Sequence, residues 1–538
     1  MYYPNELVYF KKTNFNHPQG LLIFKEAPEP PTPAEKQIQI RLAHRLLKFC
    51  QNTIHGVNHI WEPHTKPVVR IFWCLIVTTA LIGCILLYNT VTQRHREEVL
   101  VTVVETSHLP IYEIPFPAVA ICPVNHINWM RYKAAEARFL PRYAAKEAKT
   151  AFYNLMVLLD RMTFTRLSSI DEFLKTKNIP RSVENIVLSD VAKFMALRCD
   201  EIFIWCSFDN TQHDCCKIFV PEYTGRGPCL VFNSVISKES RIKKLTDNFY
   251  PWRARYGGEG SGLSFRLRYN SSLVRPGTTI PFAFTVLVKE ADEWSDTLFH
   301  ILQKNTHNSL MVTPIITETS RNTRHIAPAK RKCVFADEMT KYDQIDGLTF
   351  HKYNCLVRCE EKFLLNTCNC TTSMFFPGIP NQPEKECKVS DLQCMYDHSD
   401  IFNYLKEPDQ DEYINDTRRG MSCDCLNSCQ SLLFLVKLNV LPLPIPNDTM
   451  PVISGEVYFG KNTITKYSSR LQYTYLDLVS NFGGILGLFL GASVLSIAEV
   501  VYAIIRELVI FGLYKLSTRQ KRRRITVVKR KGVSKMKK

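Results

Sequence analysis

Two long apolar runs near the ends of the chain dominate its pattern of hydrophobic and polar positions. The first is an 18-residue run without a charged side chain, Ile71–Tyr88, and the second is a 21-residue run, Leu478–Ala498. About 20 apolar residues in a helix cross the hydrocarbon layer of a membrane, which is roughly 30 Å thick. The pattern therefore predicts two membrane-spanning helices, residues 68–88 and 476–505. The alternative for each run is a helix buried in a protein core.

The flanks of the apolar runs predict their orientation. The tail after Gly512 carries 12 Lys and Arg and no acid, whereas residues 1–67 carry eight basic and five acidic residues. Basic flanks stay on the cytoplasmic side. We therefore expect residues 1–67 and 506–538 to be cytoplasmic and residues 89–475 to lie outside the cell. The first run follows a long polar, proline-containing segment, so we do not expect it to be a cleaved signal peptide.

Cysteines and glycosylation sequons concentrate in the segment predicted to be extracellular. Sixteen of the 19 cysteines lie there, and the other three are Cys50, Cys74 and Cys84. An even, concentrated set of cysteines is typical of an oxidising compartment. Close cysteine pairs also form zinc sites, but outside the cell disulfides are the stronger interpretation, and we expect no metal. The sequons begin at Asn270, Asn369, Asn415 and Asn447, and the cysteines on either side of Asn369 could block its modification.

The extracellular segment mixes strand and helix patterns, which predicts an α+β domain. Alternating or continuous apolar positions predict strands at 99–105, 116–122, 262–270 and 281–290. Residues 130–162 are rich in helix formers and predict a helix despite Pro141. The cysteine-dense part, 333–429, has little apolar content, so we expect it to be rich in loops and held by disulfides.

Charge and motifs exclude several classes of function. The net charge of +17 is concentrated in the C-terminal tail, which favours an orientation anchor that also binds anionic lipids of the inner leaflet, and not nucleic acid. The chain has no nucleophile elbow, zinc helix or phosphate-binding loop. The glycine-rich segment Gly257–Gly262 lacks the lysine of a phosphate loop and predicts a turn between strands. We expect no enzyme and no cofactor, and we expect transport or recognition.

Glycines distinguish the second apolar run from an ordinary membrane helix. They are Gly483, Gly484, Gly487 and Gly491. Each costs a helix about 1 kcal/mol relative to alanine, and their spacing is typical of closely packed membrane helices. Simple helix pairing is one explanation. The other is a pore formed by several copies, in which the helix unwinds at Gly491-Ala492-Ser493 and exposes backbone to water. The carboxylate of Glu499 would then attract cations.

Five motifs, in order, resemble the degenerin/epithelial sodium channel superfamily, and most of all its insect pickpocket branch. They are His55-Gly56, "FPAVAICPVN" at 116–125, "GPCLVFN" at 227–233, the cysteine array, and "GGILGLFLGAS" at 483–493. The resemblance covers nearly the whole chain. It implies a trimer, formed from identical or related subunits, that conducts sodium ions through the plasma membrane and belongs to the amiloride-sensitive class. It also implies a hand-and-ball domain with a palm sheet, a β-ball and helical finger, knuckle and thumb parts.

The resemblance also implies roles for particular residues. Gly491, Ala492 and Ser493 would form the selectivity filter, while His55 and Gly56 would take part in gating. Ser480 occupies the position at which bulky side chains hold such channels open. The implied disulfides are Cys333–Cys429, Cys355–Cys425, Cys359–Cys423, Cys368–Cys394, Cys370–Cys387 and Cys122–Cys229. The partners of Cys199, Cys206, Cys215 and Cys216 stay open.

The chain departs from the acid-sensing relatives at two places. It has "APAKRKC" at 327–333 where those relatives have a Pro-Pro-Trp-like stretch, and no His-His pair follows the first apolar run. The resemblance therefore does not support proton gating. Two alternatives to a conducting subunit remain, a two-span receptor or adhesion protein and a purely modulatory subunit. An ATP-gated two-span trimer shares the topology but has neither the His-Gly nor the Gly-x-Ser motif.

Overall fold

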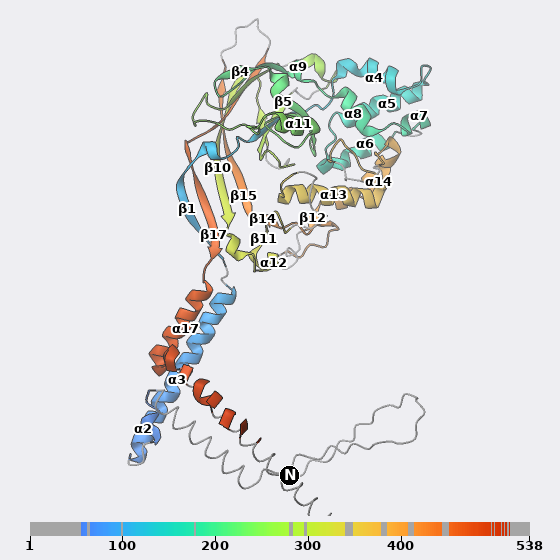
Figure 1. Cartoon of the computed structure of the whole chain (residues 1–538). Coiled ribbons are helices and arrows are strands. Elements are labelled where there is room, and N and C mark those ends of the chain that lie inside the picture. Colours follow the sequence, from blue (N-terminus) through green and yellow to red (C-terminus); the bar gives the residue numbers. More distant parts are fainter. Residues whose placement is uncertain are drawn as a thin grey trace, which may run out of the picture. The chain divides into compact units, whose positions relative to one another are not determined.

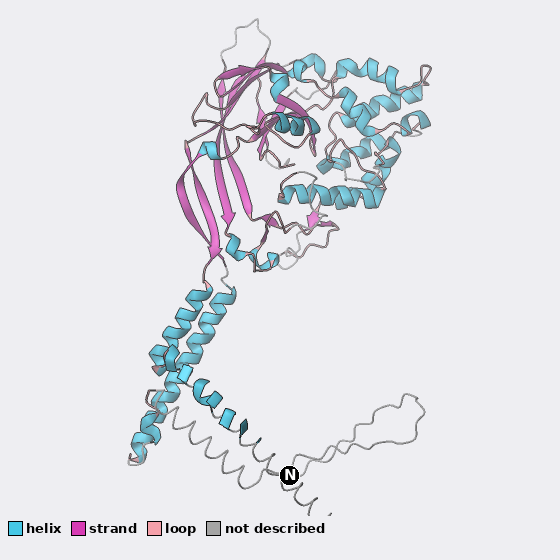
Figure 2. Ribbon diagram, viewed as in Figure 1, coloured by secondary structure: helices cyan, strands magenta, loops and turns pink. Residues whose placement is uncertain are grey.

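The chain forms two compact units, Met1–Glu97 with Tyr473–Lys538 (unit 1) and Glu98–Gln472 (unit 2). A computed structural model shows their elements (Figures 1 and 2). It describes residues 55–61, 65–97, 100–176, 179–268, 270–278, 283–294, 299–338, 348–377, 385–406, 414–443, 451–496, 498–499, 501–506, 508–510, 512–513 and 516. Cys50, Asn447 and most of the basic tail lie outside these residues.

Unit 1 is helical throughout its described elements. They are α2 (Asn58–Trp61), α3 (Pro67–Glu97), α17 (Tyr475–Leu490) and the helix Val494–Ile510. Helix α3 is long and apolar enough to cross a membrane, and none of its residues is buried. The second predicted span is instead a pair of helices bent by 83° at a short break, and it passes the same test only when the pair is taken together.

The larger sheet of unit 2 is organised around strand β10. Over Thr306–Val312 one edge of β10 runs parallel to β16, and over Ile315–Thr319 it runs parallel to β17. The other edge pairs antiparallel with β15 along 13 positions. The strands, in sheet order, are β1 (Leu100–Pro110), β17 (Thr463–Leu471), β10 (Thr306–Thr319), β16 (Val452–Phe459), β7 (Leu263–Arg268), β3 (Phe203–Phe208) and β4 (Thr211–His213), with β15 (Gln430–Pro442) beside β10.

Three smaller sheets complete the β structure described for unit 2. The five-stranded sheet has the order β5 (Phe219–Thr224), β6 (Gly227–Phe232), β2 (Ala118–Pro123), β8 (Phe284–Lys289) and β9 (Phe299–Leu302). The two-stranded sheets are β11 (Cys333–Val334) with β14 (Asn427–Ser428), and β12 (Leu405–Lys406) with β13 (Met421–Ser422). Each of the four predicted strand segments overlaps a strand, β1, β2, β7 or β8, so the strand predictions are confirmed.

Most of the helices of unit 2 gather on one side, at the right of Figure 1. The α-helices are α4 (Tyr132–Phe139), α5 (Lys146–Leu159), α6 (Ile170–Leu174), α7 (Arg181–Glu184), α8 (Leu188–Met195), α9 (Cys199–Ile202), α10 (Cys215–Ile218), α11 (Lys238–Thr246), α12 (Pro328–Arg331), α13 (Lys352–Cys368), α14 (Leu392–Asp397) and α15 (Ser399–Phe402). Short 3₁₀ turns are η1 (Ile111–Glu113), η2 (Trp129–Arg131), η3 (Phe164–Ser169), η4 (Ser271–Leu273), η5 (Arg321–Thr323) and η6 (Val389–Asp391).

One sequence prediction about helices is wrong, and another leaves out a helix. The segment 130–162 is not one helix, because the chain is non-helical between Phe139 and Lys146; Pro141 lies in this gap, and proline cannot donate the backbone hydrogen bond that a helix interior needs. The cysteine-dense segment is held by disulfides, as predicted, but besides its loops it contains the 17-residue helix α13. Its apolar side chains, among them Leu364 and Phe375, join those of α5 and α8 in one buried cluster. This cluster is a core that neither segment could form alone.

Eight disulfides cross-link unit 2. The six pairs that the resemblance implies are all bonded, from Cys122–Cys229 to the five pairs between Cys333 and Cys429. The structure also resolves the open pairing, since Cys199 bonds Cys216 and Cys206 bonds Cys215. Cross-links of this kind stabilise a fold mainly by restricting its unfolded chain, by roughly 2–4 kcal/mol each.

The β structure has its own core, with Phe116 of the "FPAVAIC" segment at its centre. Phe116 is fully buried, and its ring lies 5.2 Å from that of Phe208, 5.2 Å from that of Phe459 and 6.2 Å from that of Phe232, in edge-on arrangements. Phe232 belongs to the five-stranded sheet and the other two rings to the larger sheet. The two sheets are therefore joined by aromatic packing.

A buried ion pair lies in the five-stranded sheet. Lys289 Nζ donates to Glu222 Oε1 at 2.6 Å, and the two side chains are only 3% and 2% exposed. The second carboxylate oxygen of Glu222 accepts a hydrogen bond from the hydroxyl of Ser234 at 2.7 Å. The charge of each partner is thus compensated inside the protein, which is the condition under which a buried charge is tolerated.

We predict that Lys289→Met destabilises the chain because it leaves the carboxylate of Glu222 buried without a counter-charge. The expected cost is about 3–5 kcal/mol, which corresponds to a fall of roughly 5–10 °C in the melting temperature of the detergent-solubilised chain. The double variant with Glu222→Met should regain most of the loss. Lys175→Met, which breaks the exposed pair with Asp171, serves as the control and should leave the melting temperature unchanged. Equal effects of both single variants would contradict the prediction.

Candidate functional site

The candidate site is the break between α17 and the next helix, at Gly491-Ala492-Ser493. Gly491 has φ +61°, a left-handed conformation that ends a helix and that glycine adopts without a steric cost. Its N–H donates to the carbonyl of Gly487 at 3.1 Å, and the N–H of Ala492 donates to the carbonyl of Leu486 at 3.3 Å. The last turn of α17 is thereby closed, and the three residues that follow Leu490 are not helical.

Ser493 starts the helix on the other side of the break. Its hydroxyl accepts from the N–H of Ser496 at 3.2 Å, and the hydroxyl of Ser496 accepts from the N–H of Ser493 at 3.3 Å. These two reciprocal hydrogen bonds resemble a capping box, in which side chains accept hydrogen bonds from the free backbone amides of the first helical turn. The run of small residues is therefore a defined helix stop followed by a helix start.

His55 of the His-Gly motif lies against this break. Its backbone N–H donates to the carbonyl of Leu490 at 3.2 Å. The imidazole lies so close to Gly491 that a Cβ at that position would overlap the ring. Gly56 has φ +85° and lies beside the side chains of Trp73 and Val77 on α3. The His-Gly segment therefore contacts both α3 and the end of α17 within unit 1.

The other predicted site residues make few contacts within the chain. Ser480 and Glu499 are exposed on their helices. A Cβ at Gly483 or Gly484 would meet nothing within 4 Å, and one at Gly487 would lie 3.9 Å from the carbonyl oxygen of Ala492. Their predicted role in packing neighbouring helices does not arise within a single chain, and it stays a prediction about contacts between copies.

Sequence reasoning missed a glycine of α3, Gly83, against which the ring of Phe489 on α17 packs. A Cβ at Gly83 would lie 2.6 Å from the ring of Phe489. One further contact between the helices is the stack of Tyr88 on Phe482, with ring centroids 4.8 Å apart. Gly83 is the one glycine in the first apolar run, and that isolation is the signal that could have identified it.

The sequons differ in their surroundings. Asn369 is exposed in a left-handed conformation at the C-terminal end of α13, between two bonded cysteines. Asn415 is exposed as well. The side-chain oxygen of Asn270 is engaged by the hydroxyl and the N–H of Ser272 at 2.6 and 3.0 Å.

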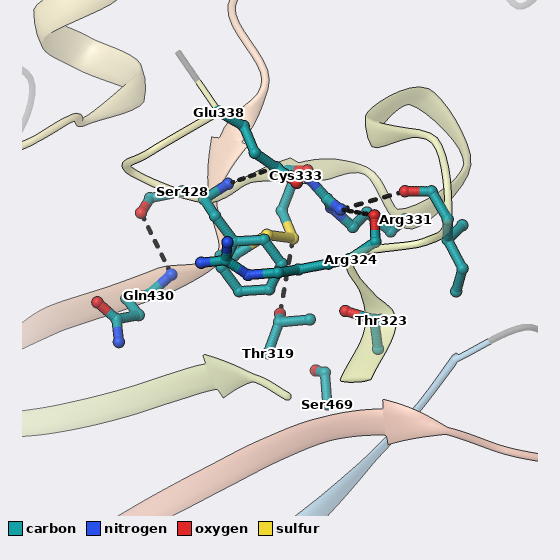
Figure 3. The surroundings of a disulfide bond; sticks show 12 residues. Thr319, Thr323, Arg324, Arg331, Cys333, Glu338, Ser428, Gln430 and Ser469 are labelled. Atoms are coloured by element: carbon teal, nitrogen blue, oxygen red, sulfur yellow. Dashed lines mark hydrogen bonds and ion pairs between the residues drawn. A yellow bond between two sulfur atoms is a disulfide. The ribbon is translucent and has the colours of Figure 1, made fainter. Parts of the chain in front are cut away.

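The buried side chain of Arg331 lies beside the disulfide between Cys333 and Cys429 (Figure 3). The guanidinium of Arg331 donates to the carbonyls of Cys333 and Ile326 at 2.9 and 3.1 Å and forms an ion pair with Glu338. The hydroxyl of Thr319, at the end of β10, lies 3.6 Å from the sulfur of Cys333. The beginning of the cysteine-dense segment is thus fixed to the end of the central strand.

A second charged group, missed by sequence reasoning, joins three elements of unit 2. His351 Nε2 lies 2.9 Å from Asp292 Oδ1, and His351 Nδ1 lies 3.7 Å from Glu290 Oε1. That Glu290 oxygen also accepts from the N–H of Leu432 on β15 at 3.3 Å. Asn354 of α13 accepts from the N–H of Trp294 at 2.7 Å. The turn after β8 is therefore tied to both α13 and β15, and we call this group the 290–351 junction.

Two of the three titratable groups of the 290–351 junction, Glu290 and His351, favour their protonated forms. Burial raises the pKa of Glu290 to about 8, although the charge of His351 opposes the change. Burial alone would lower the pKa of His351, but the hydrogen bond and charge of Asp292, with the charge of Glu290, raise it to about 9.

The described residues contain two groups with metal-ligand chemistry, and neither is a convincing metal site. In the first, Cys368 and Cys394 are bonded to each other and have no thiolate to offer. In the second, both ring nitrogens of His351 face carboxylates of the 290–351 junction, so the ring has no lone pair directed at an ion.

The helix break, the disulfide framework and the mixed sheets belong to a known class of membrane protein. The family model described as "Amiloride-sensitive sodium channel" matches residues 49–503. The chain therefore belongs to the amiloride-sensitive sodium channel family, which is the degenerin/epithelial sodium channel family of the resemblance. It is a channel subunit of that family and not an enzyme, and the family needs no cofactor.

Individual relatives agree with the family. The chain is 40% identical to Pickpocket protein 19 of Drosophila melanogaster over 505 residues, which cover 93% of this chain and 96% of that protein. It is 26% identical to Sodium channel protein Nach of Drosophila ananassae, over 84% of this chain and 85% of the relative. It is 23% identical to Acid-sensing ion channel 1 of Gallus gallus, over 84% and 81%. The predicted likeness to the pickpocket branch is thus confirmed.

We predict that the chain becomes less stable as pH rises from about 6.5 to 9. In this range the folded chain holds more protons than the unfolded one at Glu290, whose pKa is raised to about 8, and at His351, whose pKa is raised to about 9, and stability falls where the folded chain holds more protons. Below pH 6.5 the buried His126, whose pKa is lowered to about 4, acts in the opposite direction. Glu290→Gln imitates the protonated acid, so its melting temperature should fall less between pH 6.5 and 8. The control Glu172→Gln, at an exposed position, should follow the wild type. Parallel curves for Glu290→Gln and wild type would contradict the prediction.

Proposed function

We propose that three subunits, identical or related, form a sodium-selective channel of the plasma membrane with its filter at Gly491-Ala492-Ser493. The observation that carries the proposal is the break in the second apolar helix at these residues. In this proposal α3 and the bent pair α17 with Val494–Ile510 each cross the membrane, and both termini are cytoplasmic. The basic tail then meets the anionic inner leaflet, to whose lipids it would bind.

Backbone chemistry supports a filter at the break. Non-helical backbone is tolerated at membrane depth only where it is buried in protein or lines water. Three copies of the break around one axis would place backbone oxygens and the hydroxyl of Ser493 along the pathway, where they replace part of an ion's water shell. One helical segment further along, three exposed carboxylates of Glu499 would favour cations over anions. Gly483, Gly484 and Gly487, open in the single chain, would then pack the copies together.

The His-Gly segment is proposed to take part in gating because of its contact with the break. The N–H of His55 donates to the last carbonyl of α17, and its ring covers Gly491. A movement of this segment relative to α3 would therefore change the backbone next to the filter. Ser480, exposed on α17, is the proposed position at which a bulky side chain prevents closure.

The extracellular parts of the hand-and-ball architecture are proposed to correspond to the elements of unit 2. The larger sheet would be the palm and the five-stranded sheet the β-ball. Helices α4 to α8 would be the finger, and α13 to α15 with their disulfides the thumb. The knuckle stays a prediction without an assigned element.

We predict that Gly491→Ala and Ser493→Ala reduce the preference for sodium over potassium. The new methyl at position 491 would overlap the ring of His55 and would strain a left-handed backbone, and the Ser493 change removes a hydroxyl that caps the next helix. In oocytes with sodium on one side and potassium on the other, a tenfold loss of preference moves the reversal potential by about 59 mV. Val494→Ile, at an exposed neighbour, is the control. Unchanged reversal potentials would remove both residues from the filter.

We predict that Ser480→Phe produces a constitutive cation current that amiloride blocks, whereas Ser480→Ala behaves like the wild type. The measurement is two-electrode recording in oocytes, with the chain expressed alone and together with related subunits, and with its surface level measured by labelling. Surface-expressed Ser480→Phe without current in every combination would favour the non-conducting receptor. A change only in the currents of co-expressed subunits would favour the modulatory role.

A further inference from the structure

A hollow of about 640 Å³ lies in unit 2 between helices and the five-stranded sheet. Its walls come from the two ends of α4, from α8 with the connection to α9, and from β5 and β6. This volume is in the range of small-molecule sites. All of its lining residues belong to unit 2, so the hollow is separate from the helix break in unit 1.

The described lining of the hollow carries more positive than negative charge. Its cationic residues are Arg131, Arg138, Lys193 and Arg198, and its one acidic residue is Asp190. All of these except Arg131 are exposed, so they are accessible to a dissolved molecule. A concave surface with an excess of one sign of charge concentrates ions of the opposite sign. The hollow therefore favours an anion.

The carboxylate of Glu201, which lies next to this lining, is already engaged by other groups. Its Oε1 accepts from Asn128 Nδ2 at 2.9 Å and forms an ion pair with Arg131. Its Oε2 accepts from the backbone N–H of Arg198 at 2.8 Å. The guanidinium of Arg131 also donates to the carbonyl of Ala196 at 2.8 Å. Arg131 is thus compensated within the protein, and the excess charge comes from the exposed cations.

Arg138 is the exposed cation that the structure holds in place. Its guanidinium lies over two rings, 5.0 Å from the centroid of Phe194 and 5.7 Å from that of Phe139. Among the residues that the structure describes, its N–H groups have no acceptor. Stacking on rings occupies the face of a guanidinium and not its edge. The edge pairs with a carboxylate through two parallel hydrogen bonds.

Apolar side chains provide much of the remaining wall. The rings of Phe139 and Phe194 pack edge-on with centroids 5.7 Å apart, and both line the hollow. Leu197, Leu230 and Tyr223 line it as well. Such surfaces bind an aromatic or aliphatic body. The wall therefore fits a molecule that has an anionic group and an apolar body.

We propose that this hollow binds a small organic carboxylate with an aromatic or aliphatic body. The carboxylate would pair with the guanidinium of Arg138, and the body would lie against Phe194 and Leu230. The occupant would connect α4 and α8 with β5 and β6, because these elements share the hollow. An effect on current rests on the proposed channel function, but binding does not. The two can therefore fail separately.

A suitable probe is para-benzoylbenzoate, since it joins a carboxylate to an aromatic ketone that labels its surroundings when irradiated. The full chain, solubilised in an uncharged detergent, is labelled over a range of concentrations, and the labelled peptides are identified by mass spectrometry. We expect saturable labelling of peptides that contain Arg138 or Phe194–Arg198. The uncharged amide, para-benzoylbenzamide, should need a concentration at least about tenfold higher for half-saturation, the ratio for a hydrogen bond with a charged group.

Two variants of Arg138 separate ion pairing from adsorption to an apolar surface. Arg138→Gln should raise the half-saturating concentration of para-benzoylbenzoate at least about tenfold. Arg138→Lys keeps the charge but not the planar edge, so its value should lie between those of Arg138→Gln and the wild type. Arg142→Gln is the matched control, because Arg142 is exposed and does not line the hollow. It should label like the wild type.

A reversal of charge tests the same contact by a gain of binding. Arg138→Glu should lose the labelling by para-benzoylbenzoate and acquire labelling of the same peptides by the ammonium probe para-benzoylbenzylamine. The wild type should bind the ammonium probe there at least about tenfold more weakly than the carboxylate. A gain of this kind occurs only in a folded hollow. The loss of ring contacts should lower the melting temperature by no more than about 4 °C.

Three results would overturn the proposal. They are labelling that does not saturate, equal half-saturating concentrations of the carboxylate and the amide, and equal labelling of Arg138→Gln and the wild type. If the labelling behaves as expected while no subunit combination carries current, the binding site stands and the proposed channel function fails. If currents are present and insensitive to para-benzoylbenzoate despite saturable labelling, binding stands and its effect on current is rejected.

Discussion

Strand β10 is the element on which the rest of unit 2 depends, because both of its edges are paired along most of its length. One edge holds β15, and the other holds β16 and then β17. Every other strand of the larger sheet is attached through one of these three. The strand ends at Thr319, beside the disulfide between Cys333 and Cys429. The N–H of Thr319 donates to the carbonyl of Cys429 at 2.7 Å. The strands of the sheet and this disulfide are therefore both held to β10 by hydrogen bonds.

In unit 1 the structure depends on a different constraint: the backbone amides and carbonyls of the apolar helices must all form hydrogen bonds. The break after Leu490 satisfies it by local means, a left-handed glycine and a serine cap, and by one long-range hydrogen bond from His55. Non-helical backbone at this place costs little because its neighbours take up the amides and carbonyls. An interruption that would destabilise an ordinary membrane helix is here a defined structure, which makes it suitable for a repeated, narrow site.

Several features of the fold follow from local chemistry and could be predicted from the sequence. The apolar runs predict α3 and α17, and the small residues at 491–493 predict where the second run is interrupted. The four strand segments are present. The prediction of one helix over 130–162 is wrong because helix propensity did not outweigh the missing amide of Pro141. The prediction of a loop-rich, disulfide-held segment at 333–429 did not include α13, because local composition does not reveal that α13 shares a core with α5 and α8.

The sequence by itself determined the positions of the helix stop, the apolar runs and the cysteines, because each depends on properties of neighbouring residues: charge, propensity and backbone freedom. The tertiary structure decided which distant residues meet. It placed His55 against Gly491, Phe489 against Gly83, and His351 between Glu290 and Asp292. It also paired Cys199 with Cys216 and left the indole of Trp294 without an acceptor. These contacts arise only when the whole chain packs, since the residues involved lie on separate elements whose approach no local pattern records.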